Sequence, residues 1–587
     1  MKRDESIVND VSCLAIAGFF AIGLILLGVR LKEVQVDGAA DYGYANVRQS
    51  ERRVQTVGGR GRIVDRNGVV LAGNRETISI VCDVAHFQRK SWAATATEVR
   101  KAIANLEKVV GGSSPLTDRA IRRHVNQSLA MPLTVFRDVD LKTLAKFAEN
   151  EWRLKGFSCL RTKDRTYPNG SLAAHLLGYV GKDRAETVAG DEKFNFYDLE
   201  MRGRSGLEVY YDSFMRGVPG EKRILVDARG FAIDEWTVTK AQKGPDLELA
   251  IDIELQRAVE KQLKGERGGC AVIDPRNGEV LALASSPGFD PNDFVPSLSK
   301  ELYDAYANDP AKPLLNRASG GSYAPGSTFK PITALAGLLA GYSATDKYEC
   351  VGVFTMGSMH LRCARRWGHG QMDMRNALKE SCNPYFCNLG VSTGTNLLMR
   401  TALAFGLGAK TGLDLGVDAA GVVPDADWKL RTYKEHWYPG DLAQMSIGQG
   451  MLLVSPLQMA RVAGAIATGK LVTPHLKRDI EPEFTPLPFS RNQLAVVREG
   501  MRMVVDGGSG KRGGEGLAVS VAGKTGTAEV GIGERRRKNT WFIAYAPVDA
   551  PRLAIAMVIE NGMSGGATTA PKVREVLKVA FGERGDG

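Results

Sequence analysis

Residues 11–29 form an apolar segment, VSCLAIAGFFAIGLILLGV, that contains no charged side chain. A helix of this length, rising about 1.5 Å per residue, nearly spans the hydrocarbon core of a bilayer, which is about 30 Å thick. The run is longer than the apolar core of a usual signal peptide, and Arg30, Leu31 and Lys32 after it offer no small-residue cleavage site. The segment therefore predicts a retained transmembrane helix at residues 11–29, preceded by a cytoplasmic tail at residues 1–10.

The charge of the chain does not by itself identify its orientation or its partners. Basic and acidic residues are mixed before the segment and basic residues follow it, so charge alone does not determine which side faces out. A formal net charge of +11 suits nucleic acid, anionic lipid or an anionic polymer. The basic residues are spread along the chain, and we expect no nucleic-acid partner.

The 587 residues exceed one ordinary hydrophobic core and predict several folded units. The stretch Ala241–Pro245 (AQKGP) is polar and contains Gly and Pro, and a new pattern beginning with a strand follows it. We therefore place a boundary there, between an extended region at residues 30–245, called the pedestal, and a second domain at residues 246–587.

The apolar patterns predict a multidomain α+β protein. In the pedestal, RGRIVDRNGVVLAGN at residues 60–74 predicts a β-hairpin, residues 95–150 show helical spacing, and strands are expected at residues 203–230. In the second domain, strands are expected at residues 247–251, 270–273, 280–284, 519–530, 540–546 and 553–560. Strands at both ends with helices between them indicate a central sheet closed by segments that are distant in sequence.

The first motif is GSYAPGSTFKP at residues 321–331, where Pro325 and Gly326 turn the chain before an apolar segment that ends at Gly341. This pattern predicts a helix with a glycine stop, and it places Ser327 and Lys330 on one face. A serine hydroxyl is a poor nucleophile until a base takes its proton, and a desolvated lysine beside another cation can lose its own proton near neutral pH. Alone, however, Ser-x-x-Lys is also compatible with a helix cap and a solvated lysine.

Two further segments favour the catalytic interpretation. Ser381, Cys382 and Asn383 follow a helix-like run, and the sequence KTGT at residues 524–527 lies inside a strand-like run. Ser-x-x-Lys, Ser-Asp-Asn and Lys-Thr-Gly in this order form the known signature of β-lactamases and penicillin-binding proteins, and this chain departs from it by having Cys382 in place of the aspartate.

At these residues the chain resembles the penicillin-binding transpeptidases, and the resemblance covers nearly everything after the apolar segment. GRSGLE at residues 203–208 and GQGMLLVSP at residues 448–456 look like landmarks of the class B, monofunctional enzymes. The resemblance implies a C-terminal α/β transpeptidase domain with a central antiparallel sheet flanked by helices. We find no candidate for the acidic motifs of the glycosyltransferase domain that class A enzymes carry.

The resemblance also implies the roles of the first two motifs. Ser327 would attack the D-Ala-D-Ala carbonyl of a donor stem peptide, and Lys330 would accept its proton. Ser381 and Asn383 would connect Lys330 to the leaving group and hold the substrate amide.

The third motif would bind the substrate. Lys524 would favour the neutral form of Lys330 and, with Thr525 and Thr527, bind the terminal carboxylate of the peptide or of a β-lactam. Gly526 would permit close approach of the strand to the substrate. The backbone N–H groups of Ser327 and Thr527 would form the oxyanion hole.

A cluster of thiols accompanies the second motif, whose middle residue here is a cysteine. Because successive residues of an extended loop point to opposite sides, Cys382 should face into the domain if its neighbours face the cleft. Cys350, Cys363, His369 and Cys382 form a ligand set that suits structural, tetrahedral zinc. A disulfide between Cys350 and Cys363, or inert buried thiols, remain alternatives. Similar positions form a zinc site in some elongation-type enzymes of the penicillin-binding protein 2 branch, which WGHG at residues 367–370 also resembles. No organic cofactor is expected.

The resulting prediction is a single-pass protein of the inner membrane whose periplasmic domain cross-links peptidoglycan stem peptides during cell-wall elongation. Its expected partners are stem peptides, β-lactams, a membrane glycosyltransferase and elongation-complex proteins, and residual D,D-carboxypeptidase activity is compatible with the site. The alternatives are a septal division enzyme, a scaffold that activates a glycosyltransferase, a β-lactamase and a β-lactam sensor. A lactamase needs neither the anchor nor the pedestal, and only ten residues precede the helix where a sensor needs an output module.

Overall fold

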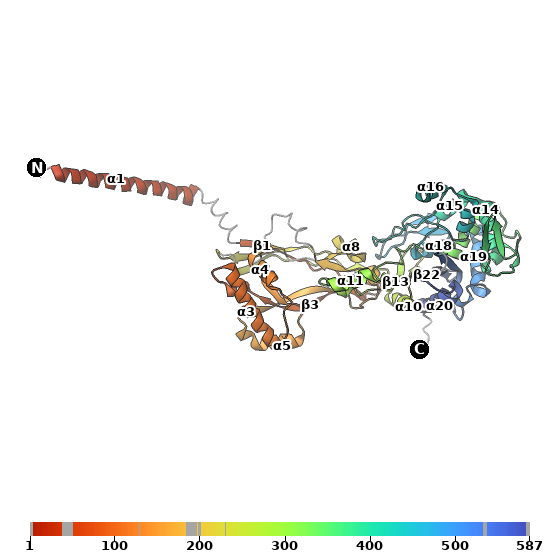
Figure 1. Ribbon diagram of the computed structural model, residues 1–587, viewed down its shortest axis with the longest axis horizontal. Helices are drawn as coiled ribbons and strands as arrows, with labels where there is room; N and C mark the ends of the chain where they lie inside the picture. The colour runs from red at the N-terminus through yellow and green to blue at the C-terminus, as the bar shows by residue number, and fades with distance from the viewer. Residues whose placement is uncertain are drawn as a thin grey trace.

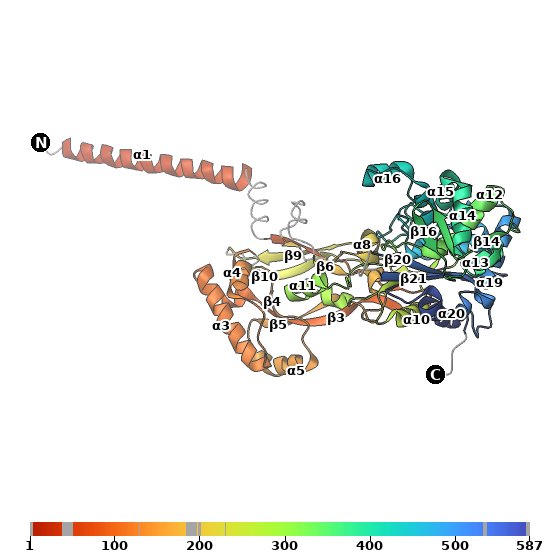
Figure 2. The ribbon, with the colours of Figure 1, turned by 45° about the vertical axis from the view of Figure 1, so that its right-hand side comes forward.

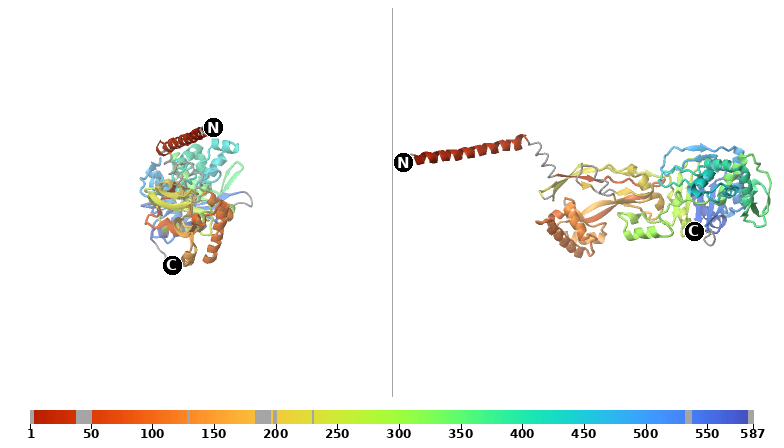
Figure 3. Two further views of the ribbon diagram at one scale, coloured as in Figure 1. Left: turned by 90° about the vertical axis from the view of Figure 1, so that its left-hand side faces the viewer. Right: turned by 45° about the horizontal axis from the view of Figure 1, so that its top comes forward.

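The computed structural model describes residues 4–37, 51–127, 130–182, 196–197, 201–228, 231–531 and 537–582. The described chain is long and narrow (Figure 1). Helix α1 lies at one end, a β-rich part lies in the middle, and a part rich in helices lies at the other end, as Figures 2 and 3 also show. The pedestal therefore separates α1 from the C-terminal domain along the long axis.

Helix α1 (Asp4–Lys32) contains the apolar segment and begins within the predicted tail. Within Val11–Asp37 the most apolar window of 18 residues has a mean hydropathy of 2.5, and none of that window is buried against other parts of the protein. Among the described residues, this is the one helix that is long and apolar enough to cross a bilayer. The predicted N-terminal helix is confirmed.

The pedestal contains two larger sheets, with strand orders β10-β9-β1-β7 and β11-β2-β3-β4, and β5 pairs with β3. The strands are β1 (Glu51–Thr56), β2 (Ile63–Val64), β3 (Val70–Cys82), β4 (Leu133–Phe136), β5 (Phe157–Thr166), β6 (Val180–Lys182), β7 (Phe196–Tyr197), β8 (Met201–Gly203), β9 (Gly220–Val226), β10 (Ala232–Thr239) and β11 (Leu247–Glu248). The helices are α3 (Trp92–Val110), α4 (Asp118–Gln127), α5 (Leu141–Asn150), α6 (Ala174–Leu177), α8 (Gly206–Tyr210) and α9 (Asp212–Met215).

The predicted hairpin is formed by β2 and β3, which pair antiparallel. Its turn is fixed by Asp65, whose Oδ1 accepts hydrogen bonds from the backbone N–H groups of Asn67 at 2.9 Å and Val69 at 2.8 Å. Gly68 adopts a φ of 82°, which a glycine adopts at little cost. The helices expected in residues 95–150 are present as α3, α4 and α5.

The expectation of strands at residues 203–230 is partly wrong, because α8 and α9 occupy its first half. Helix α8 carries Glu208, which is fully buried between Arg60 and Arg165 at 2.7 and 2.6 Å. Tyr167 also donates its hydroxyl to Glu208 at 3.2 Å. Burial alone would raise the pKa of Glu208, but the two guanidinium groups outweigh it and lower the pKa. A helix places this carboxylate between strand β5, which carries Arg165, and the segment between β1 and β2, which carries Arg60.

The strand expected at the start of the second domain pairs instead with the pedestal. Strand β11 lies parallel to β2, and the next residue, Leu249, forms an antiparallel bridge with Lys477 of the C-terminal domain. Asn292 also connects the two parts, since its side chain bonds to the backbone N–H and C=O of Tyr167. The two parts therefore meet across β11, and the boundary at residues 245/246 stays a prediction.

The C-terminal domain is built on an antiparallel sheet with the order β13-β12-β22-β21-β20. These strands are β12 (Gly268–Ile273), β13 (Val280–Ser286), β20 (Ala522–Val530), β21 (Arg537–Ala546) and β22 (Leu553–Glu560). One face packs against α18 (Pro456–Thr468), and the other packs against α10 (Ile253–Leu263) and α20 (Ala570–Ala580). The predicted central antiparallel sheet flanked by helices is confirmed.

The remaining elements lie between β13 and β20, and some of them line the site. They are α11 (Lys300–Asn308), the 3₁₀ turn η5 (Gly326–Phe329), α12 (Lys330–Leu339), β14 (Tyr348–Cys350), β15 (Val353–Met356), β16 (Met359–Arg362), β17 (Gly370–Met372), α13 (Met374–Lys379), α14 (Asn383–Thr393), α15 (Thr395–Ala404), α16 (Ala426–Tyr433), α17 (Pro439–Ser446), β18 (Lys470–Val472), β19 (Phe484–Pro486) and α19 (Arg491–Gly507).

Candidate active site

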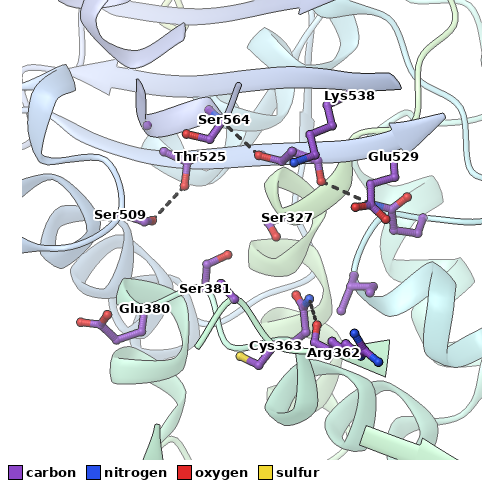
Figure 4. Close-up of a pocket in the computed structure, with 18 of the residues that line it drawn as sticks. Ser327, Arg362, Cys363, Glu380, Ser381, Ser509, Thr525, Glu529, Lys538 and Ser564 are labelled. Carbon is purple, nitrogen blue, oxygen red and sulfur yellow. Dashed lines mark hydrogen bonds between the residues drawn. The ribbon is translucent and has the colours of Figure 1, made fainter. Parts of the chain in front are cut away.

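Ser327 lies in η5 at the start of α12 and lines a cleft of about 1760 Å³ (Figure 4). Gly326 before it has a φ of 55°, and a Cβ at this position would lie 2.8 Å from the backbone oxygen of Thr527. The serine turn and strand β20 therefore approach each other so closely that only glycine fits. In the part of the chain that the structure describes, the Ser327 hydroxyl has no hydrogen-bond partner, so it is free to meet a substrate.

Lys330 begins α12 and lies beneath the cleft, fully buried. Its Nζ donates to the backbone oxygen of Ser381 at 2.7 Å and to Asn383 Oδ1 at 2.6 Å, and it lies 3.3 Å from Ser381 Oγ. Lys524 is also fully buried, and its Nζ donates to the same Ser381 Oγ at 2.9 Å. One serine hydroxyl thus connects the lysines of the first and third motifs.

The two lysines are both easier to deprotonate than ordinary lysines. Burial lowers the pKa of Lys330 to about 8. Burial, together with the positive charge of Lys330, lowers the pKa of Lys524 well below its ordinary value. Because both ammonium groups share Ser381 Oγ, they titrate as a coupled pair. The pair can therefore supply a free amine near neutral pH.

The second motif forms a tight loop between α13 and α14. Ser381 has a φ of 57°, which is rare for a residue with a side chain, and Cys382 donates its backbone N–H to Ala377 at 2.9 Å. Ser381 and Asn383 line the cleft, whereas Cys382 is fully buried. Asn383 Nδ2 also donates to the backbone oxygen of Arg362 at 2.8 Å. The loop thus presents two polar side chains to the cleft and one thiol to the interior.

The third motif lies on β20, the edge strand of the sheet, beside η5. A Cβ on Gly526 would lie 2.8 Å from the backbone oxygen of Pro325 and 2.8 Å from Thr328 Cγ2. Glycine is therefore required at this position because the serine turn packs against it. The sequence predicts close approach of the substrate here, and the structure places the serine turn there. Thr525, Gly526 and Thr527 line the cleft, while Lys524 lies below it.

Several residues that line the cleft belong to none of the three motifs. They are Arg362, Glu380, Gln449, Ser509, Lys511, Arg512, Glu529, Lys538 and Ser564. Gln449 lies in the landmark at residues 448–456 and Glu380 precedes the second motif, but most of the others lie in segments without a local pattern that marks a site. Only the folded chain brings them together with Ser327.

The four residues of the predicted metal cluster lie together directly behind the second motif. Their ligand atoms are all within 4.8 Å of one another. His369 Nδ1 is 3.7 Å from Cys350 Sγ and 3.3 Å from Cys363 Sγ. A hydrogen bond from Cys382 lowers the pKa of Cys363 to about 4. All eight cysteines are free thiols in the structure, and the alternative disulfide between Cys350 and Cys363 stays a prediction.

Comparison with known proteins agrees with this architecture. Residues 268–578 match the family described as penicillin-binding protein transpeptidase domain, and residues 55–249 match the penicillin-binding protein dimerisation domain. The chain belongs to the penicillin-binding protein family of transpeptidases. The pairing of these two domains in one chain confirms the predicted class B fold and serine D-Ala-D-Ala transpeptidase activity.

Within this family the chain is of the penicillin-binding protein 2 type. It is 32% identical over 615 residues to peptidoglycan D,D-transpeptidase MrdA of Escherichia coli K12, covering 96% of this chain and 93% of the relative. The structure of the complex between penicillin-binding protein 2 and MreC from Helicobacter pylori matches with a TM-score of 0.78 and 28% identity, covering 91% of this chain and 100% of that one. A structure described as a peptidoglycan synthase complex that coordinates polymerization and crosslinking matches with a TM-score of 0.74 and 29% identity, covering 98% and 99%.

Proposed function

We propose that this protein cross-links peptidoglycan stem peptides during cell-wall elongation through an acyl ester on Ser327. The main support for this proposal is the hydrogen-bond network around Lys330, which connects residues of all three motifs. The network lies beneath the Ser327 hydroxyl, which lines the cleft. Relatives named MrdA and the likeness to penicillin-binding protein 2 favour elongation over septal division.

The first half-reaction transfers the donor peptide to Ser327. The Oγ attacks the carbonyl between the two terminal D-alanines, an Oγ–C bond forms, and the free amine of Lys330 takes the proton of the hydroxyl. The C–N bond then breaks, and Ser381 passes a proton from the lysine pair to the departing nitrogen. D-Alanine leaves with its carboxylate, and the shortened peptide remains as an ester.

The second half-reaction forms the cross-link. An amine of a neighbouring stem peptide attacks the ester carbonyl and forms a C–N bond, and Lys330 takes a proton from the attacking nitrogen. The C–Oγ bond then breaks, and Ser327 recovers its proton from Lys330. In both steps the carbonyl oxygen becomes negative, and the backbone N–H groups of Ser327 and Thr527 would stabilise it. Water in place of the amine would give the D,D-carboxypeptidase side reaction.

The membrane location of the protein is inferred from helix α1, and its partners are inferred from the similar structures. Helix α1 would anchor the chain in the cytoplasmic membrane, with the pedestal and the cleft on the periplasmic side. The similar structures include a complex with MreC and a synthase that both polymerises and cross-links. We infer that this chain likewise works with a membrane glycosyltransferase and with elongation-complex proteins.

The four-residue cluster fits a structural zinc ion. A tetrahedral site with Zn–S of about 2.3 Å and Zn–N of about 2.0 Å places its ligand atoms about 3.5–3.8 Å apart, close to the separations found here. Cys350, Cys363, His369 and Cys382 would hold the ion, which would cross-link strands β14 and β16 to the loop of the second motif. Cys382 lies between Ser381 and Asn383, so the cluster would brace both side chains.

We expect the purified protein to carry about one zinc per chain and Cys363→Ser to lose it. The loss should destabilise the domain by about 1–3 kcal/mol and slow acylation, because the loop that positions Lys330 is no longer held. Metal analysis and thermal unfolding measure these effects. Cys387→Ser is the matched control, because Cys387 is equally buried but bonds to Ala443 outside the cluster. Wild-type protein that is stable and free of metal would contradict the assignment.

The pH dependence of acylation tests the lysine pair. The pKa of Lys330 is lowered to about 8, and the base must be neutral, so the acylation rate constant should rise with pH and level off above about 8. Well below that pH it should fall about tenfold per unit. Stopped-flow measurement with a chromogenic β-lactam gives this profile. In Lys330→Arg, whose guanidinium stays charged throughout, the inflection should disappear, and a flat wild-type profile between about pH 6 and 9 would refute the role of the pair.

A further inference from the structure

Ser509 lies in the loop between α19 and β20, outside all three motifs, and lines the cleft. Its hydroxyl is 2.8 Å from Thr525 Oγ1, the contact drawn as a dashed line in Figure 4. We propose that Ser509 is a positioning residue for the substrate carboxylate and that residues 508–512 form the anion-binding end of the cleft. This inference rests on the proposed function, because it assigns a substrate preference to the same site.

The position of Ser509 is set by two walls of the cleft. Its backbone N–H donates to the backbone oxygen of Lys379 at 3.3 Å, at the end of the helix that leads into the second motif. On the other side a Cβ on Gly566 would lie 2.3 Å from the backbone oxygen of Ser509, so the segment after β22 packs directly against this loop. The hydroxyl is therefore held at a fixed place beside Thr525.

The direction of the hydrogen bonds explains what Ser509 contributes. A threonine hydroxyl has one proton, and it can give that proton to a carboxylate only if no neighbour uses it. Thr527 Oγ1 accepts the backbone N–H of Gly565 at 3.3 Å, which leaves its own proton available. Between Ser509 and Thr525 either hydroxyl can donate, so Ser509 can act as the corresponding donor for Thr525. A carboxylate can only accept hydrogen bonds. When it binds, Thr525 therefore donates to the carboxylate and Ser509 donates to Thr525.

The charges at this end of the cleft favour an anion. Lys511 and Arg512 line it, and within the described residues their side chains form no ion pair or hydrogen bond. Of the acidic residues that line the cleft, Glu380 is paired with Lys379 at 3.7 Å and Glu529 has a partner as well. The uncompensated charge beside Ser509 is therefore positive. Ser509, Lys511 and Arg512, which belong to none of the three motifs, thus assist the third motif in holding the substrate carboxylate.

A comparison of two substrates with one variant tests the proposal. The rate constant for acylation, kcat/KM, is measured for an acyl-D-alanyl thioester that ends in a carboxylate and for its methyl ester. For Ser509→Ala we expect a loss of about 3- to 10-fold with the carboxylate, the size of one hydrogen bond between neutral hydroxyls, and a change under about twofold with the ester. Ser509→Thr keeps the hydroxyl and should restore the rate with the carboxylate.

The two cations are tested separately with the double variant Lys511→Gln, Arg512→Gln. Exposed charges act over distances that salt screens, so the variant should lose several-fold with the carboxylate at low ionic strength and little at about 1 M salt. The methyl ester should react equally with wild type and variant at both ionic strengths. Thermal unfolding of each variant confirms that the domain is folded.

Equal losses with both substrates, or no loss with either, would overturn the proposal and leave Ser509 with a packing role only. That result would still leave wild-type acylation at Ser327 intact. Failure of the wild-type protein to form an adduct at Ser327 with either substrate would instead refute the proposed function itself. The two failures are therefore distinguishable in one set of measurements.

Discussion

Alanine in place of Ser327 should leave the protein folded but unable to form a covalent adduct with any β-lactam or peptide ester. The hydroxyl is the atom that becomes the ester, and the side chain is only half-buried without a hydrogen-bond partner in the described structure, so its loss costs little stability. The rate of adduct formation should fall by about 10⁴-fold or more, to the background of the reagent. Intact-mass measurement with a penicillin shows the adduct directly, and peptide mapping locates it.

Ser322→Ala is the matched control for this experiment. Ser322 lies on the same segment, is exposed and is not part of the network around Lys330. Its replacement should leave both the rate and the mass shift unchanged. An adduct of undiminished yield in Ser327→Ala would mean that another residue is acylated, and the assignment of the three motifs would then be wrong.

Glu208→Ala should destabilise the pedestal by about 3–5 kcal/mol. The substitution removes the one carboxylate that lies between Arg60 and Arg165, both of which are almost fully buried. Leaving a buried guanidinium without a partner destabilises the fold by much more than the intact ion pair stabilises it, because no water replaces the lost partner. Asp212 still contacts Arg60 at 2.7 Å, so Arg165 carries most of the penalty.

The effect of Glu208→Ala is measured by thermal or urea unfolding of the full chain. Tyr167→Phe, which removes only the hydroxyl that donates to Glu208, should cost about 0.5–1.5 kcal/mol. Lys101→Ala breaks an exposed ion pair with Glu98 and should cost under about 1 kcal/mol. If all three variants unfold alike, the buried network contributes no more than a surface pair.

The parts of this protein that sequence predicts well are those determined by near neighbours. The hairpin at residues 60–74 contains its own turn, with Asp65 capping the backbone and Gly68 at a positive φ. Likewise, Asp252 caps α10 through the backbone N–H groups of Glu254 and Leu255. The three motifs are recognisable because each needs fixed residue types at short spacing.

Long-range packing explains what the sequence does not reveal. Strand β1 lies between β9 and β7, more than 140 residues away, and β11 joins the pedestal sheet although its pattern reads as the start of the next domain. Glu208 looks like an ordinary surface carboxylate in the sequence until α8 places it between two arginines. Ser509 has no motif around it, and only the approach of its loop to β20 brings it to Thr525.

The order of the central sheet also determines which later strands the third motif depends on. Strand β20, which carries Lys524 and its neighbours, touches the rest of the sheet only through β21, and β21 is joined to β12 only through β22. Strand β20 also packs against α19 and η5, but its place in the sheet depends on β21 and, through β21, on β22. A chain that ends before Leu553–Glu560 therefore lacks the strand through which β21 and β20 join the rest of the sheet.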